Sequence, residues 1–258
     1  MLPTASAPPH RADGLAAAYR RLIDVCPALR VSIVGATSEP DPTWVRTDGT
    51  ASAVEGLIAF ESTRIAMEHG TAPPAHVAAS RLLHDYLWSV SLLISGHWYL
   101  TQQVPELLAS DLWIDPPTAD LALRPGRCAP GGPDALRDAV VAHLEPVIAA
   151  FQPFTKRGPR ALWGMVADDL VSGIWYLARM LGEEARGIEL ASAVLAGDQP
   201  RLPGSANFRL LSDGEARARW TRTRLGCCLY YAIGPTESCL TCPRTSDAER
   251  IRRLAAEA

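Results

Sequence analysis

Four of the six cysteines lie close together near the C-terminus, and they are the residues of this chain best suited to chemistry. They follow one another as Cys227-Cys228, ten residues, Cys239, two residues and Cys242. A closing pair two residues apart suits a tight turn, and the ten intervening residues are enough for a strand and turn that return to the first pair. Neighbouring side chains of a strand point to opposite faces, so Cys227 and Cys228 share one centre only if the backbone bends there. The spacing therefore predicts a metal centre in this segment.

Spacing alone leaves four interpretations of this cysteine cluster: an Fe–S cluster, a structural zinc site, two disulfides or buried thiols. Structural zinc usually takes two separated pairs, whereas the first pair here is contiguous, and the spacing also differs from common ferredoxin patterns. In a reducing cytoplasm, clustered cysteines favour metal binding over disulfides. We therefore predict metal binding, with iron and zinc both open. The remaining Cys26 and Cys128 are expected to be small hydrophobic residues.

The segment Arg219–Pro243 resembles the C-terminal signature of the FhuF family of ferric siderophore reductases. It reads RWTRTRLGCCLYYAIGPTESCLTCP, and the family pattern is CC-x10-C-x2-C. The arginines Arg222 and Arg224 before the double cysteine, the CCLYY run and the proline after the last cysteine extend the similarity. The stretch Leu162–Leu170, LWGMVADDL, is also similar to a tryptophan-bearing helix of that family.

This resemblance implies a cytoplasmic reductase that gives one electron to Fe(III) held by an imported siderophore. The implied cofactor is a [2Fe-2S] cluster bound by Cys227, Cys228, Cys239 and Cys242. Oxygen-rich chelators hold hard Fe(III) better than the softer Fe(II), so one electron loosens the ligand and frees the metal. The implied partners are a ferric siderophore substrate and an electron donor, either a protein or a diffusible reductant. The alternative is a non-enzymatic four-cysteine metal protein, either a zinc-stabilised binding module or an Fe–S redox sensor.

The other polar residues form no second motif. The histidines of the chain's interior are scattered without the i, i+4 spacing of a helical zinc site: His69, His76, His84, His97 and His143. Adjacent residues of a helix do not face each other, so Asp168 and Asp169 are expected to be capping or solvated. The arginines Arg222 and Arg224 are expected to be solvated or paired. No P-loop, G-x-G-x-x-G or G-x-S-x-G motif is present, so no nucleotide, flavin or serine-hydrolase site is predicted.

The elements that must position the cysteines indicate a mainly helical α+β protein. Hydrophobic periodicity predicts helices over about 15–25, 51–69, 74–103, 134–150, 161–181 and 183–196. A short strand is predicted at 30–35, and a small hairpin between 107 and 127, around Pro116-Pro117. The predicted organisation is a disordered lead over 1–11, a helical substrate-side domain with short strands over 12–206, and a [2Fe-2S]-binding module over 207–258.

Composition sets limits on the class of protein. The chain of 258 residues is 48% apolar and has 7 Trp, which is enough for a sizeable core. Its net charge of -3 and the lack of a Lys/Arg run argue against a nucleic-acid partner. The longest apolar stretch, 86–100, is shorter than the roughly 20 residues that span a bilayer, so we predict a buried helix and no transmembrane segment. The N-terminus lacks the apolar region of a secretory signal, so we expect a cytoplasmic protein.

Overall fold

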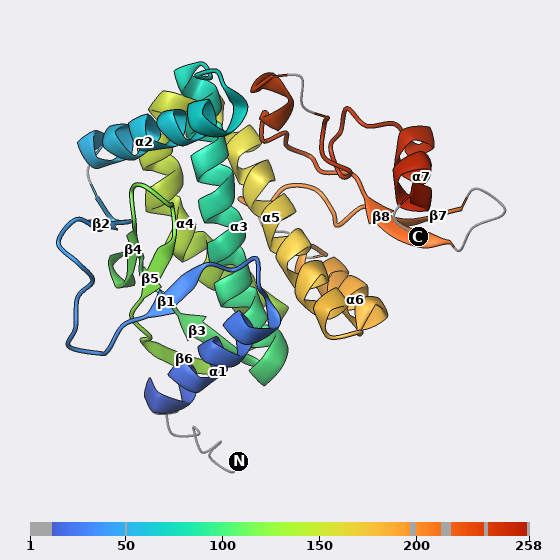
Figure 1. Cartoon of the computed structure of the whole chain (residues 1–258). Helices are drawn as coiled ribbons and strands as arrows, with labels where there is room; N and C mark the ends of the chain where they lie inside the picture. Colours follow the sequence, from blue (N-terminus) through green and yellow to red (C-terminus); the bar gives the residue numbers. More distant parts are fainter. Residues whose placement is uncertain (1–11, 50, 197–199, 213–217, 235–236, 257–258) are drawn as a thin grey trace, which may run out of the picture.

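The computed structural model describes residues 12–49, 51–196, 200–212, 218–234 and 237–256. The predicted disordered lead, 1–11, lies outside these residues. The fold is mainly helical α+β, as predicted (Figure 1). Its helices are α1 (Ala12–Val25), α2 (Ala51–His69), α3 (Ala75–Thr101), α4 (Pro133–Thr155), α5 (Pro159–Met180), α6 (Glu184–Val194) and α7 (Asp247–Ala256).

Helix α3 is the centre of the helical body, and α1, α2, α4 and α5 pack against it (Figure 1). Every residue from Val90 to Tyr99 is buried. A helix that is apolar on all faces must be covered by other helices, so this element forms the core. Within the described residues, no helix has a segment long and apolar enough to cross a bilayer.

Glycines allow two helices to approach α3 closely. A Cβ atom at Gly173 of α5 would lie 3.4 Å from the Cα atom of Leu92. A Cβ atom at Gly96 of α3 would lie 2.7 Å from Leu22 Cδ1 of α1, closer than packing permits. Close packing of α5 on α3 matters for the site below, because these two helices supply its acidic and histidine side chains.

Helix α4 is longer than predicted. The sequence suggested an end near Ala150, but the helix continues past Pro146 and Pro153 to Thr155. Each proline inside a helix costs roughly 3 kcal/mol. The buried side chains Ile148 and Phe151 offset part of this cost, at about 1.5–3 kcal/mol each. Tertiary burial therefore overrides the local signal.

The strands form three small sheets. The largest has the order β1-β5-β4-β2, built from β1 (Val31–Ile33), β2 (Val45–Arg46), β4 (Leu112–Ile114) and β5 (Leu121–Leu123). Strands β4 and β5 are antiparallel and flank Pro116-Pro117, which confirms the predicted hairpin. Strand β1 pairs in parallel with β5. A second sheet pairs β3 (Gln103–Glu106) with β6 (Arg127–Pro130).

The C-terminal segment, defined here as residues 208–256, lies beside α5 in orange and red (Figure 1). It begins with the antiparallel pair β7 (Phe208–Leu211) and β8 (Arg219–Arg222). A single 3-10 turn, η2 (Tyr230–Ala232), follows the double cysteine, and α7 closes the segment. The strand expected between the two cysteine pairs is absent from the described residues 229–234 and 237–238. The domain boundary near residue 207 stays a prediction.

Candidate metal centre

The four clustered cysteines are free thiols in two loops that follow β8. Cys228 and Cys242 are buried, while Cys227 and Cys239 are partly exposed. The second loop is a tight turn, because the backbone N–H of Cys242 donates to the carbonyl of Cys239 at 3.0 Å. The hydroxyl of Thr245 donates to the same carbonyl at 2.9 Å. The closing pair thus lies in the turn that its spacing predicted.

The two adjacent cysteines have different partners. Cys227 lies close enough to Cys242, and Cys228 close enough to Cys239, for each pair to affect the pKa values of its members. The next residue, Leu229, has a φ of 64°, and its N–H donates to Cys227 Sγ at 3.4 Å. The chain therefore turns directly after the double cysteine. The adjacent sulfurs meet opposite members of the second loop and give two pairs.

Positive charge surrounds the sulfurs. Interaction with Cys239, together with the charges of His84 and Arg81, lowers the pKa of Cys228 to about 4, although burial acts in the opposite direction. The same interaction raises the pKa of Cys239. Arg81 of α3 interacts electrostatically with Cys228 and lies over the Tyr230 ring, 5.2 Å from its centroid. Positive charge near Cys228 therefore favours its thiolate, the form that binds metals.

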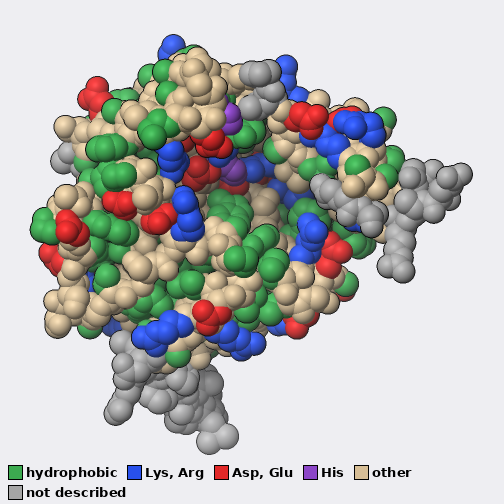
Figure 2. All heavy atoms as spheres, in the orientation of Figure 1, with side chains coloured by type: hydrophobic (Ala, Val, Ile, Leu, Met, Phe, Trp, Pro, Cys, Tyr) green, Lys and Arg blue, Asp and Glu red, His purple; other side chains and the backbone are tan. Residues whose placement is uncertain are grey.

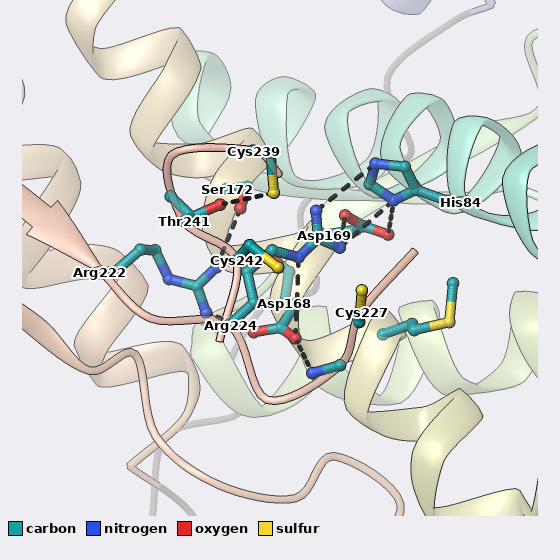
Figure 3. A network of polar contacts seen from close by, with 12 residues as sticks. His84, Asp168, Asp169, Ser172, Arg222, Arg224, Cys227, Cys239, Thr241 and Cys242 are labelled. Carbon is teal, nitrogen blue, oxygen red and sulfur yellow. Dashed lines mark hydrogen bonds and ion pairs between the residues drawn. The ribbon is translucent and has the colours of Figure 1, made fainter. Parts of the chain in front are cut away.

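A buried ion-pair network joins the cysteine loop to the helical body (Figure 3). Arg222 pairs with Asp168 at 2.7 Å, and Arg224 pairs with Asp169 at 2.6 Å. His84 Nδ1 lies 2.9 Å from the second oxygen of Asp169. Figure 3 shows the labelled sulfurs of the loops around this network. In Figure 2, charged and histidine side chains gather in the hollow between the body and the C-terminal segment.

The network corrects one prediction about the acidic pair. Asp168 and Asp169 were expected to be capping or solvated, but both are 0% exposed. Adjacent helix positions diverge, so each carboxylate takes its own arginine. Arg222 and Arg224, two apart, lie on one face of an extended chain. They are paired, one of the two predicted roles. The R-x-R pattern and the Asp-Asp pair on an apolar helix were the available signals, and sequence reasoning did not connect them.

The two carboxylates differ in acidity. Burial raises the pKa of Asp168 more than Arg222 and Arg224 lower it. Burial acts on Asp169 too, but Arg224 and His84 outweigh it and lower the pKa of that carboxyl. Asp168 also accepts the backbone N–H of Gly226 at 2.7 Å, which fixes the residue before the double cysteine. The network thus holds the start of the cysteine loop on α5.

The remaining predicted residues take structural places. Cys26 is 0% exposed, and Cys128 is buried with its thiol donating to Gln103 Oε1 at 2.8 Å. His143 is buried between Tyr86 and a backbone carbonyl. His84 belongs to the network around the cysteines, a role that its spacing did not suggest.

The chemistry of the four thiols suits a metal ion better than their arrangement in this structure does. In the residues that the structure describes, no three or more His, Cys, Asp or Glu side chains form a group that could hold a metal ion. The four thiols nevertheless form two pairs, and a [2Fe-2S] cluster takes two thiolates at each iron. Arg224 Nε is buried without a hydrogen-bond acceptor among the described atoms, which leaves a donor near the sulfurs. The residues present therefore fit such a cofactor in the chemistry of their donor atoms.

Comparison with known proteins adds no relative: no family model and no curated protein matches this chain.

Proposed function

We propose that this protein is a [2Fe-2S] reductase of the cytoplasm that reduces siderophore-bound Fe(III) to Fe(II). The observation that carries the proposal is that two loops bring Cys227 and Cys228 toward Cys239 and Cys242 beside buried arginines. These four residues would hold the cofactor. When bound, the cofactor supplies a centre that takes up and gives one electron at a time.

The chain's own residues support one-electron chemistry through their charges. The guanidinium groups of Arg81 and Arg224 act on the Cys228 thiolate. Positive charge and N–H donors near sulfur stabilise a more negative centre, which favours uptake of an electron. Arg224 is 7% exposed, so water screens its charge little. Asp169 neutralises part of the charge of Arg224, so the network acts mainly by positioning the loop, while Arg81 adds positive charge near Cys228.

The electron balance of the reaction is simple. A one-electron donor, either a reduced redox protein or a diffusible reductant, supplies the electron that Fe(III) gains to become Fe(II). The chelating oxygens then hold the metal less well, and protons replace it on the freed ligand. Cys227 is partly exposed, so the centre lies near the surface, where a ferric chelate can approach.

The proposal is tested with anaerobically purified protein reduced by dithionite and then freed of excess reductant. A ferric hydroxamate complex and an anionic ferric carboxylate complex are added in separate reactions, each together with a strong Fe(II) chelator whose Fe(II) complex absorbs visible light. We expect one Fe(II) released for each electron stored, and repeated release when a donor is added. Storage of an electron without Fe(II) release would favour the redox sensor. A colourless zinc protein would favour the binding module.

A further inference from the structure

A cavity of about 560 Å³ opens beside Cys227. Its walls come from the start of α5 and from the loop just before the double cysteine. Two glycines keep the walls close: a Cβ atom at Gly204 would lie 2.3 Å from Leu225 Cδ1, and one at Gly226 would lie 2.9 Å from Met165 Cγ. The volume lies in the range of small-molecule sites. The cavity thus brings a small ligand next to a cysteine of the candidate centre.

Two arginines line this cavity without an acidic partner. Arg157 is half-buried and reaches Met165 Sδ at 3.3 Å, while Arg160 is exposed in the first turn of α5. Neither forms an ion pair with any carboxylate in the described part of the chain, and the cavity wall holds no acidic residue. The electrostatic influences on Arg157 are those of Cys227, Cys228 and Tyr231. The cavity therefore has a net positive wall.

A second cavity that is lined by arginines differs in this respect. It measures about 410 Å³ and includes Arg30, Arg64 and His84. Arg30 pairs with Asp120 at 3.0 Å, and Arg64 forms an ion pair with Glu61. Its arginines are already neutralised by carboxylates, and no cysteine lines it. Positive charge free for a ligand therefore gathers in the cavity beside Cys227.

We propose that this cavity selects anionic ferric chelates, whose outer oxygens contact Arg157 and Arg160. This inference rests on the proposed function, because it names the class of substrate. Guanidinium groups bind carboxylate and catecholate oxygens through charge-assisted hydrogen bonds. Catecholate and carboxylate chelates of Fe(III) carry net negative charge, whereas simple tris-hydroxamate complexes are neutral. The protein discriminates between these classes by charge before any electron moves.

The test measures binding with a metal that cannot be reduced. The full chain, purified anaerobically, is titrated with a Ga(III) tris-catecholate complex and with a neutral Ga(III) tris-hydroxamate complex by calorimetry at low salt. We expect the anionic complex to bind about tenfold tighter or more, and the difference to shrink at high salt. The double variant Arg157→Gln, Arg160→Gln removes this preference, and Arg157→Lys, Arg160→Lys restores part of it.

Two controls make the result decisive. Arg20→Gln alters an exposed arginine of α1 and should leave both affinities within about twofold. Thermal unfolding of each variant checks that the fold is retained. Equal binding of the two complexes, or anion binding that survives the double glutamine variant, overturns the inference. Binding of an acidic redox protein, with no binding of either Ga(III) complex, also overturns the inference. The two arginines would then form a docking surface for the electron donor.

Iron and sulfide assays on the same preparations separate the two proposals. If the protein lacks iron and sulfide but still prefers the anionic complex, the proposed function is contradicted and the anion-binding site is supported. A cluster-bearing protein that binds both Ga(III) complexes equally contradicts only the charge selection.

Discussion

The helical body and the C-terminal segment are held by different forces. In the body, α3 buries ten consecutive residues, Val90–Tyr99, among apolar side chains of its neighbours. The described part of the C-terminal segment buries three arginines instead: Arg222, Arg224 and Arg250. A short segment without a core of its own holds its cysteines by directional bonds. Substitutions that remove a charge should therefore disturb the geometry of the C-terminal segment. Substitutions that remove core volume should instead disturb the helical body.

The largest expected effect is that of Arg222→Ala. This change leaves Asp168 buried without its partner, which costs about 3–5 kcal/mol. We expect the segment to detach from α5, so that the cysteines of the metal-free protein react faster with an aromatic disulfide reagent. Arg219→Ala, at the less buried end of β8, is the matched control. Equal thiol reactivity in the two variants would contradict the comparison.

Removing a side chain from the core of the helical body should lower stability without making the cysteines more reactive. Leu93→Ala in α3 removes a side chain that is 0% exposed and costs about 2–5 kcal/mol, seen as a lower urea midpoint. Without denaturant, thiol reactivity should equal that of the unchanged protein. A rise as large as that of Arg222→Ala would mean that the two regions are not held separately.

The body should also have a pH dependence of its own, through His143. Burial lowers the pKa of this histidine to about 4, from an ordinary value near 6.5. Its Nδ1–H donates to the carbonyl of Leu107 at 2.9 Å, and Nε2 lies 2.8 Å from the Tyr86 hydroxyl. Between pH 6.5 and 4 the unfolded chain binds the proton and the folded one does not. Stability should therefore fall by about 1.4 kcal/mol per pH unit as pH drops through this window.

Urea unfolding at several pH values measures this slope. His143→Gln keeps a polar side chain that does not titrate. The slope of the unfolding free energy between pH 6.5 and 4 should therefore decrease by about 1.4 kcal/mol per pH unit, which corresponds to one proton. An unchanged slope would assign the pH dependence to other groups.

The smallest expected effect is local to the second cysteine loop. Arg250 donates to the carbonyls of Leu240 and Cys242, each at 2.8 Å. Arg250→Met keeps the apolar stem and loses these bonds, at about 1–2 kcal/mol. Amide hydrogen exchange should accelerate around residues 239–245 and stay unchanged in α3. Exchange that stays slow in the loop would show that the turn is held without this arginine.

The sequence predicted the parts of the molecule that local patterns determine. Apolar periodicity and prolines located helices α1 to α6 but not α7, and two apolar runs around Pro116-Pro117 located the hairpin. The extension of α4 past Ala150 and Pro153 was not predictable, because it depends on burial against other helices. Likewise, the pairing of Arg222 with Asp168 joins residues 54 positions apart, and no local pattern encodes that contact.

The candidate site was predictable in composition and not in arrangement. Spacing identified the four cysteines, but the division of Cys227 and Cys228 between two partners depends on the turn at Leu229. A positive φ at a leucine has no sequence signature, unlike one at glycine. The choice of iron over zinc came from the resemblance and not from the spacing.

The most direct test of the central claim is the cofactor itself. Protein purified without oxygen is assayed for iron and acid-labile sulfide, and its EPR spectrum is recorded before and after dithionite, alongside Cys228→Ser. The account predicts about two irons and two sulfides per chain and an S = 1/2 signal only after reduction, with loss or change of both in the variant. A colourless, EPR-silent protein containing zinc, or a Cys228→Ser variant with unchanged iron content and spectrum, would contradict it.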